Sequence, residues 1–235
     1  MSAVRWAYAF IDRPYAEFGA ACDFWARVTG TRLSELRGER GKFVTLMPSG
    51  GDPCLKVQGV LDGAGGAHVD LAVEDVVGEA RRARSLGAGA VYSEPGLEVL
   101  RSPAGQLFCL VAWQGERVVP GAVPPRSRLD QVCLDTPSDA FDAEVAFWGR
   151  LTGWPEVACA GPEFRVLAAS PVRLLFQRLD SGDVASAHLD VACGDRSAVR
   201  GVHEGLGAVR VREGRTWTVM RDPSGGAYCL TDRTP

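Results

Sequence analysis

The sequence repeats itself, and this repeat restricts the fold more than any other feature. Residues 67–73 read AHVDLAV, and residues 187–193 read AHLDVAC, 120 positions later. At the same offset, SPAGQLFCL (102–110) returns as DPSGGAYCL (222–230). Matches over separate segments at one offset are the signature of a duplicated unit. The chain therefore consists of two homologous halves, and each half must reach the same fold.

A proline-rich segment joins the two halves. The stretch ERVVPGAVPPRSR (116–128) holds three prolines and a glycine, which interrupt helices and strands. We predict a first domain over residues 1–115, a linker over 116–127 and a second domain over 128–235.

Each half shows the same alternation of strand-like and helix-like patterns. Apolar residues in CDFWARVTG (22–30) recur at near-helical spacing until Gly30 ends the helix, and VAFWGRLTG (145–153) repeats the pattern. Strand-like runs such as KFVTLMP and CLKVQGV follow. Asp75 and Asp195 then stand where the next helix of each half needs an N-cap. The pattern predicts an α+β fold of four βαβββ modules with mixed sheets.

Composition and motifs exclude several classes of function. A net charge of -3 gives no electrostatic reason to expect nucleic acid, and no apolar run reaches the roughly 20 residues that span a bilayer. No secretory signal is visible, so we expect a cytoplasmic protein. No nucleophile elbow, phosphate-binding loop or HExxH motif is present. The seven cysteines lie mostly in apolar runs and are expected to be reduced core residues. His203 is expected to face solvent, and Trp25 and Trp148 the core.

Strand alternation predicts which side chains share a face of each sheet. In AHVDLAV the apolar residues Val69 and Leu71 share the face beneath the helix, which turns the histidine and the aspartate to the other face. The second half and the neighbouring strands follow the same rule. The polar face of each half then collects a histidine, an aspartate and a glutamine: His68, Asp70 and Gln58 in the first half, and His188, Asp190 and Gln177 in the second. These groups either form a ligand pocket or satisfy one another across the strands, and the pattern leaves both open.

The tandem βαβββ pattern, the FW and TG pair in the first helix of each half, the HxD strand and the DPSGGAYCL ending resemble the vicinal oxygen chelate superfamily. That superfamily includes glyoxalase I, bleomycin-resistance proteins and extradiol dioxygenases, and the likeness is to its tandem glyoxalase-like domain proteins. It implies curved sheets that form a cup in each half, with metal ligands on the first strand of each module and on the last strand. Those positions hold Gln131, His188 and Cys229 in the second half, and Tyr8, His68 and Cys109 in the first.

The resemblance leaves three functions open. The resemblance implies a metal-binding glutamate on the last strand, but a cysteine stands there in both halves. We therefore favour a metal-free protein that binds an apolar or aromatic metabolite or drug. A lyase, isomerase or dioxygenase with a degenerate divalent-metal site in the second half is an alternative, and a structural or partner-binding module is another. We expect a monomer or homodimer with a small-molecule ligand and no nucleic-acid or membrane partner. No catalytic residue is predicted; the predicted ligand-binding residues are Gln131, His188, Asp190, Gln177, His68, Asp70 and Gln58.

Overall fold

The computed structural model describes residues 3–159, 161–180 and 184–235. Its first half contains β1 (Val4–Pro14), α1 (Phe18–Val28), β2 (Arg32–Leu33), β3 (Phe43–Met47), β4 (Leu55–Val60), β5 (Gly66–Val73), α2 (Val76–Ser85), β6 (Gly89–Glu94), β7 (Leu97–Arg101) and β8 (Leu107–Ala112). Its second half contains β9 (Ser127–Pro137), α3 (Phe141–Thr152), β10 (Glu156–Val157), β11 (Phe164–Leu167), β12 (Arg173–Leu179), β13 (Ser186–Cys193), α4 (Arg196–Gly205), β14 (Val209–Glu213), β15 (Trp217–Arg221) and β16 (Ala227–Thr231).

The strands form two mixed sheets with the same order. One sheet runs β2-β3-β4-β1-β5-β8-β7-β6, and the other runs β10-β11-β12-β9-β13-β16-β15-β14. In three of the modules the last strand lies parallel to the first, as β1 with β4, β5 with β8 and β13 with β16. Strands that follow one another in the chain, such as β3 with β4 and β15 with β16, are antiparallel. The predicted α+β fold of four βαβββ modules in two tandem halves is therefore confirmed.

The helix ends follow the local sequence. Asp75 caps α2 by accepting a hydrogen bond from Gly78 N at 2.8 Å, and Asp195 caps α4 by accepting one from Ala198 N at 3.0 Å. Gly153 ends α3 with a φ of 67°, a left-handed conformation that glycine adopts without steric cost. Both N-caps are the residues that the sequence predicts.

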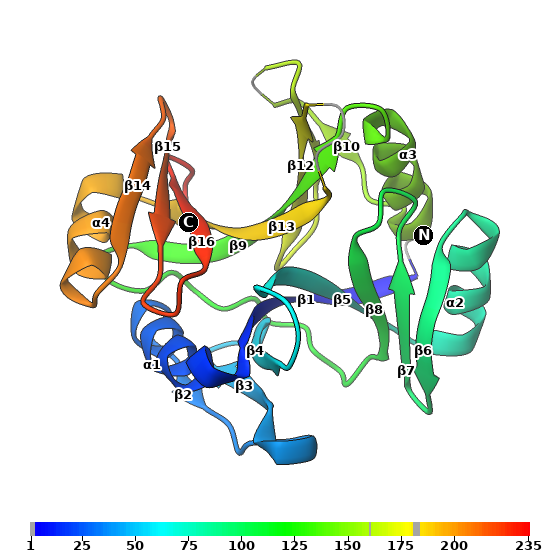
Figure 1. Cartoon of the computed structure of the whole chain (residues 1–235), viewed down its shortest axis with the longest axis horizontal. Helices are drawn as coiled ribbons and strands as arrows, with labels where there is room; N and C mark the ends of the chain where they lie inside the picture. Colours follow the sequence, from blue (N-terminus) through cyan, green and yellow to red (C-terminus); the bar gives the residue numbers. More distant parts are fainter. Residues whose placement is uncertain (1–2, 160, 181–183) are drawn as a thin grey trace. The chain divides into compact units, whose positions relative to one another are not determined.

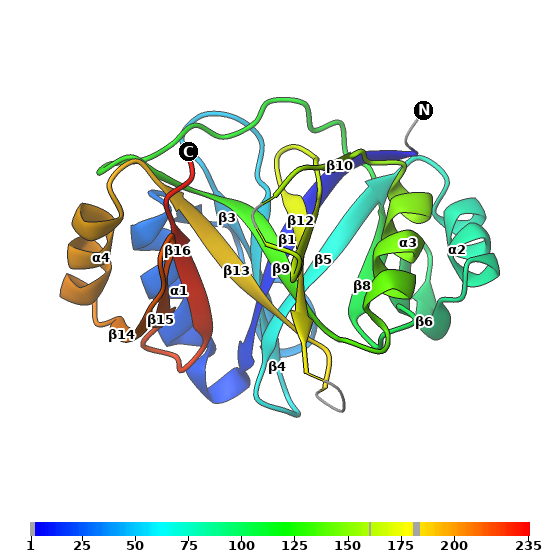
Figure 2. The same cartoon turned by 90° about the horizontal axis from the view of Figure 1, so that it is seen from above.

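Contacts divide the chain into two compact units that each combine residues of both halves. Unit one comprises Met1–Tyr8, His68–Glu116 and Val132–Ala187, and unit two comprises Ala9–Ala67, Arg117–Gln131 and His188–Pro235. Unit one thus contains both α2 and α3, and unit two contains both α1 and α4. Figures 1 and 2 show α2 near α3 and α1 near α4. The residue limits of the two domains stay a prediction.

Aromatic side chains form the core of unit two. The rings of Trp25 and Tyr228 lie 5.1 Å apart, and Trp25 Nε1 donates a hydrogen bond to Asp222 Oδ2 at 3.0 Å. His203 is also here, only 1% exposed, with Nδ1 2.9 Å from the Tyr228 hydroxyl. The prediction that His203 faces solvent is wrong, because His203 follows Val199 by one helical turn and shares its buried face.

Unit one has a related core built around the other tryptophan. Trp148 and Phe108 pack with ring centroids 4.9 Å apart, and Trp148 Nε1 donates to Glu144 Oε1 at 2.8 Å. Glu144 Oε2 in turn accepts from Ala104 N at 2.9 Å. Trp25 and Trp148 are both fully buried, as the sequence predicts.

Two further expectations from the sequence concern the cysteines and membrane-spanning helices. Six of the seven cysteines are buried as expected, but Cys159 is exposed. Among the described residues, no helix has both the length and the apolar character that crossing a bilayer requires.

Candidate functional site

Strand register brings four side chains together in unit two: three predicted ligand-binding residues and a cysteine. His188 and Asp190 lie two residues apart on β13, so their side chains leave the same face of the strand. The parallel pairing of β13 with β16 sets Asp190 directly opposite Cys229. Gln131, on β9, reaches Asp190 through its side-chain amide. We call Gln131, His188, Asp190 and Cys229 the second-half cluster.

Asp190 is the centre of the second-half cluster. It is 3% exposed, and its Oδ2 accepts a hydrogen bond from Gln131 Nε2. Its Oδ1 lies 3.4 Å from His188 Nε2 and makes no hydrogen bond within the described part of the chain. Burial raises the pKa of Asp190 above its ordinary value, although His188, Arg233 and Gln131 act in the opposite direction. The cluster therefore holds a buried carboxyl group with one oxygen available to a donor.

The first half builds a related cluster in unit one. Asp70 on β5 lies opposite Cys109 on β8, and His68 Nε2 is 3.5 Å from Asp70 Oδ1. Tyr8 stands where the second half has Gln131, and its hydroxyl donates to the Glu116 carboxylate. The first half therefore lacks the amide that reaches the aspartate in the second half.

The two other predicted glutamines belong to different surroundings. Gln58 lies on β4, in register with Asp12 of β1 and Phe43 of β3. Gln177 lies on β12, with Oε1 4.0 Å from Cys133 Sγ. Strand alternation is confirmed for both, because Leu55, Val57, Leu174 and Phe176 are buried and their polar neighbours are less so. That Gln58 and Gln177 lie beside the histidines remains a prediction.

The sequence predicts Cys109 and Cys229 to be core residues, at positions where the family resemblance implies a metal ligand. The structure places each beside the aspartate of its half, through the register of the first and last strands of one module. The HxD motif and the cysteine both recur after 120 residues. This shared offset is the sequence signal that could have linked each cysteine to the aspartate of its half.

Comparison with known proteins assigns the family. The family model described as "Glyoxalase-like domain" matches residues 9–111 and again residues 131–231. These two matches cover most of the chain, one in each half. The chain belongs to the glyoxalase-like domain family. The resemblance to the vicinal oxygen chelate superfamily is thereby confirmed. No curated protein sequence matches the chain.

Solved structures of this glyoxalase-like fold include enzymes of different activity. A Mn(II)-bound glyoxalase from Novosphingobium aromaticivorans is 18% identical with a TM-score of 0.70, and the match covers 100% of this chain and 84% of that one. The 2,3-dioxygenase LapB from Pseudomonas is 14% identical with a TM-score of 0.65, covering 98% and 93%. A catechol 2,3-dioxygenase is 13% identical with a TM-score of 0.65, covering 100% and 95%. At these identities the likeness shows the fold alone.

Whether the clusters suit a metal ion depends on their donor types. The ligand atoms of His188, Asp190 and Cys229 lie within 4.8 Å of one another, as do those of His68, Asp70 and Cys109. An imidazole, a carboxylate and a thiolate are donors that Zn²⁺ accepts, whereas Mn²⁺ favours oxygen ligands.

Protonation of the cysteine also weighs against a metal ion in the first-half cluster. Burial, together with the charge of Asp70, raises the pKa of the Cys109 thiol to about 11. The thiol therefore keeps its proton at neutral pH, and a metal would have to displace that proton to bind. The donor set therefore does not fit Mn²⁺.

Proposed function

We propose that this glyoxalase-like protein binds a small aromatic or otherwise apolar metabolite or drug at the second-half cluster, without a resident metal ion. The observation that supports this is the buried Oδ1 of Asp190, which lacks a hydrogen bond within the described residues. Leaving a buried acceptor without a donor costs about 1–3 kcal/mol. A hydroxyl or N–H group of a ligand would relieve that cost.

The second half is the better site because of the residue on its first strand. Gln131 offers an amide that can both donate and accept, and it already orients Asp190. The aromatic ring of Tyr8 occupies the corresponding position in the first half, where its hydroxyl is engaged by Glu116. We therefore expect one ligand per chain, bound through Gln131, His188 and Asp190.

Catechol is a suitable probe for this proposal. It carries two hydroxyl donors on an apolar ring, and a protein of the same fold is a catechol 2,3-dioxygenase. Its dimethyl ether, 1,2-dimethoxybenzene, has the same ring and oxygens but no donor. A site built around an acceptor should bind catechol and discriminate against the ether.

The test is a thermal-shift titration with both compounds. We expect catechol to raise the midpoint of the wild-type protein more than 1,2-dimethoxybenzene does. His188→Ala and Gln131→Ala should lose this difference. His68→Ala, the matched change in the first half, should keep it. Equal shifts for the two compounds, or loss of the difference in His68→Ala alone, would contradict the assignment.

A metal-dependent lyase, isomerase or dioxygenase is the second candidate. The observation in its favour is the approach of three potential ligand atoms, from His188, Asp190 and Cys229, to within 4.8 Å. Elemental analysis of protein purified without chelator distinguishes the two candidates. About one equivalent of a transition metal per chain, lost in His188→Ala, would replace the binding proposal with this one.

The same proposal extends to location and partners. The net charge of -3 gives no support for nucleic-acid binding. We propose a cytoplasmic monomer or homodimer whose partner is a small molecule.

A further inference from the structure

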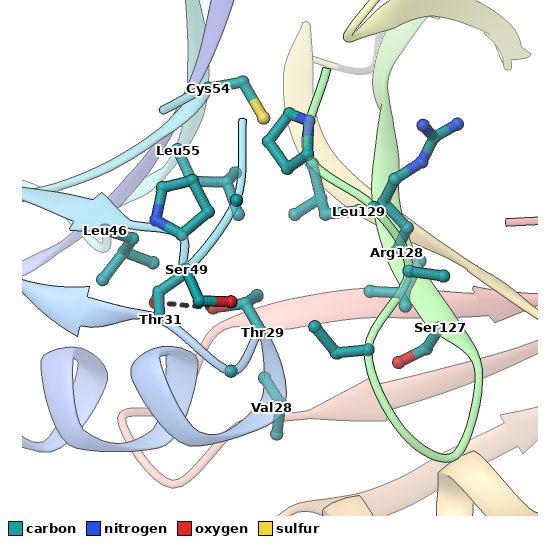
Figure 3. A pocket seen from close by; sticks show the side chains of 18 of the residues that line it. Val28, Thr29, Thr31, Leu46, Ser49, Cys54, Leu55, Ser127, Arg128 and Leu129 are labelled. Atoms are coloured by element: carbon teal, nitrogen blue, oxygen red, sulfur yellow. Dashed lines mark hydrogen bonds between the residues drawn. The ribbon is translucent and has the colours of Figure 1, made fainter. Parts of the chain in front are cut away.

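Unit two contains a cavity that is separate from the second-half cluster. Its volume is about 260 Å³, and none of the residues lining it belongs to that cluster. The walls come from the end of α1, from β3 and the start of β4, from residues 119–123 and from the start of β9, with Val191 of β13 and His203 of α4. Figure 3 shows Leu46, Ser49 and Thr29 on one side of this cavity and Leu129 and Arg128 on the other.

The lining of the cavity is mostly apolar. Seven valine and leucine side chains contribute to it: Val28, Leu46, Leu55, Val119, Val123, Leu129 and Val191. The two threonines at the end of α1 supply little donor capacity, because Thr29 Oγ1 donates to Trp25 O and also lies 2.9 Å from Thr31 Oγ1. The threonine hydroxyls therefore satisfy the backbone and each other. Such a wall favours a ligand with an apolar body.

Arg128 gives this apolar cavity a positive charge. Its Nε atom is buried and has no hydrogen-bond partner in the described part of the chain, and no described carboxylate forms an ion pair with Arg128. Its charge acts on Cys54, which lines the same cavity, but burial raises the pKa of the Cys54 thiol to about 12 and keeps it neutral. A cation beside apolar walls without a protein counter-ion is suited to an anionic group of a ligand.

The segment between the two halves is fixed where it covers the cavity. Asp52 Oδ2 accepts hydrogen bonds from Arg117 N and Val118 N, each at 2.7 Å, and Asp52 N donates to Val118 O at 2.6 Å. These bonds hold the segment just before Pro120, one of the lining residues. The wall is therefore positioned before any ligand arrives, which lowers the entropic cost of binding.

We propose that this cavity is a second ligand site, specific for a compact apolar carboxylic acid of one or two rings. The ring system would lie against the aliphatic walls, and the carboxylate would pair with Arg128. Its volume is slightly below the usual range of roughly 300–1,000 Å³ for small-molecule sites, which restricts the ligand to a compact one. This site does not depend on the second-half cluster.

The test uses two probes of the same shape, 1-naphthoate and 1-naphthalenemethanol, whose binding is followed by calorimetry. We expect wild-type protein to bind the acid at least tenfold more tightly than the alcohol. Arg128→Gln should reduce acid binding to the level of the alcohol, and Arg128→Lys should retain a preference for the acid. Thr31→Phe, which fills the cavity, should abolish binding of both probes.

Two controls separate this site from other effects. Arg150→Gln removes an exposed arginine in unit one, and His188→Ala alters the second-half cluster; neither should change naphthoate binding. If wild-type protein binds neither probe at millimolar concentration, or binds both equally, the proposal fails. It also fails if Arg128→Gln binds naphthoate as wild type does. Because the acid and alcohol are compared in wild-type protein, the proposal remains testable even if a variant does not fold.

Discussion

We expect the buried ion pair between Arg13 and Asp222 to stabilise unit two. It joins β1 of the first half to the turn that precedes β16 of the second half. Arg13 Nη2 lies 2.7 Å from Asp222 Oδ2, and the two side chains are 3% and 0% exposed. Asp222 also accepts hydrogen bonds from Trp25 Nε1, Ser224 N and Gly226 N. Both oxygens of this carboxylate therefore accept hydrogen bonds, and most of the donors are themselves buried.

Asp222→Asn should destabilise the protein by about 3–5 kcal/mol, which is the usual cost of removing one partner of a buried ion pair. The single change leaves the charge of Arg13 buried without its counter-ion. Arg13→Met combined with Asp222→Asn should cost less than the sum of the two single changes, because neither charge then remains buried. Urea denaturation followed by tryptophan fluorescence measures these differences.

A matched control is available in unit one. Asp142 pairs with Arg178 at 3.1 Å but is 83% exposed, so Asp142→Asn should cost less than about 1 kcal/mol. If Asp222→Asn also lies within about 1 kcal/mol of wild type, the pair does not hold the two modules together as inferred.

The same pair should produce a pH dependence of stability. Burial alone raises the pKa of Asp222, but Arg13, Ser224 and Gly226 outweigh burial and leave it below its ordinary value. A lowered pKa means that the contribution is present above the pKa of the unfolded chain, about 3.9, and is lost as pH falls through the folded value. Wild-type protein should therefore lose more stability than Asp222→Asn on acidification below about pH 4.

Other groups give further predictions. Burial lowers the pKa of His203 to about 4, so its stabilising contribution should be present above about pH 6.5 and lost as pH falls toward 4; His203→Gln should flatten that part of the stability profile measured by urea titration. Burial raises the pKa of Glu144, so the folded protein should be stabilised at low pH, where this carboxyl group is protonated, and should lose that stabilisation as pH rises. Glu144→Gln should remove this pH dependence. Asp190→Asn should raise the thermal midpoint by removing a desolvated carboxyl group, while abolishing the difference between catechol and its ether. Cys159, the one exposed cysteine of the described chain, should react with a thiol reagent under native conditions well before the other six do.

The modules and their helices were predictable because their signals are local. Asp75 and Asp195 stand at helix starts, and the alternation of Leu55 and Val57 with polar residues marks a half-buried strand. Two short strands, β2 and β10, were not predicted, since each has two exposed residues and no alternation to detect. Local pattern therefore gave the elements but not every edge of the sheets.

The combination of residues from both halves in each compact unit was not predictable from the sequence. It depends on contacts such as Trp25 with Tyr228 and Arg13 with Asp222, whose members are about 200 residues apart. Nothing in the local sequence of either member specifies its partner. The burial of His203 has the same origin, because its neighbours Phe24 and Tyr228 come from different halves.

The candidate site was predicted in part. Strand alternation placed His188 and Asp190 on one face, and the family resemblance pointed to Gln131 on the neighbouring strand. The approach of Cys229 to Asp190 depends on the register of a parallel strand pair, which no short-range pattern determines. The cavity beside Arg128 was missed because its walls come from seven separate segments of the chain.

Calorimetric titration of catechol into metal-stripped protein tests the proposed function most directly. The comparison is between wild type, Asp190→Asn and the matched first-half variant Asp70→Asn. Wild type and Asp70→Asn should bind catechol with about one site per chain after chelator treatment, and Asp190→Asn should bind at least tenfold more weakly. Binding that disappears on stripping and returns with Zn²⁺ or Mn²⁺, or that is unchanged in Asp190→Asn, would contradict a metal-free site centred on Asp190.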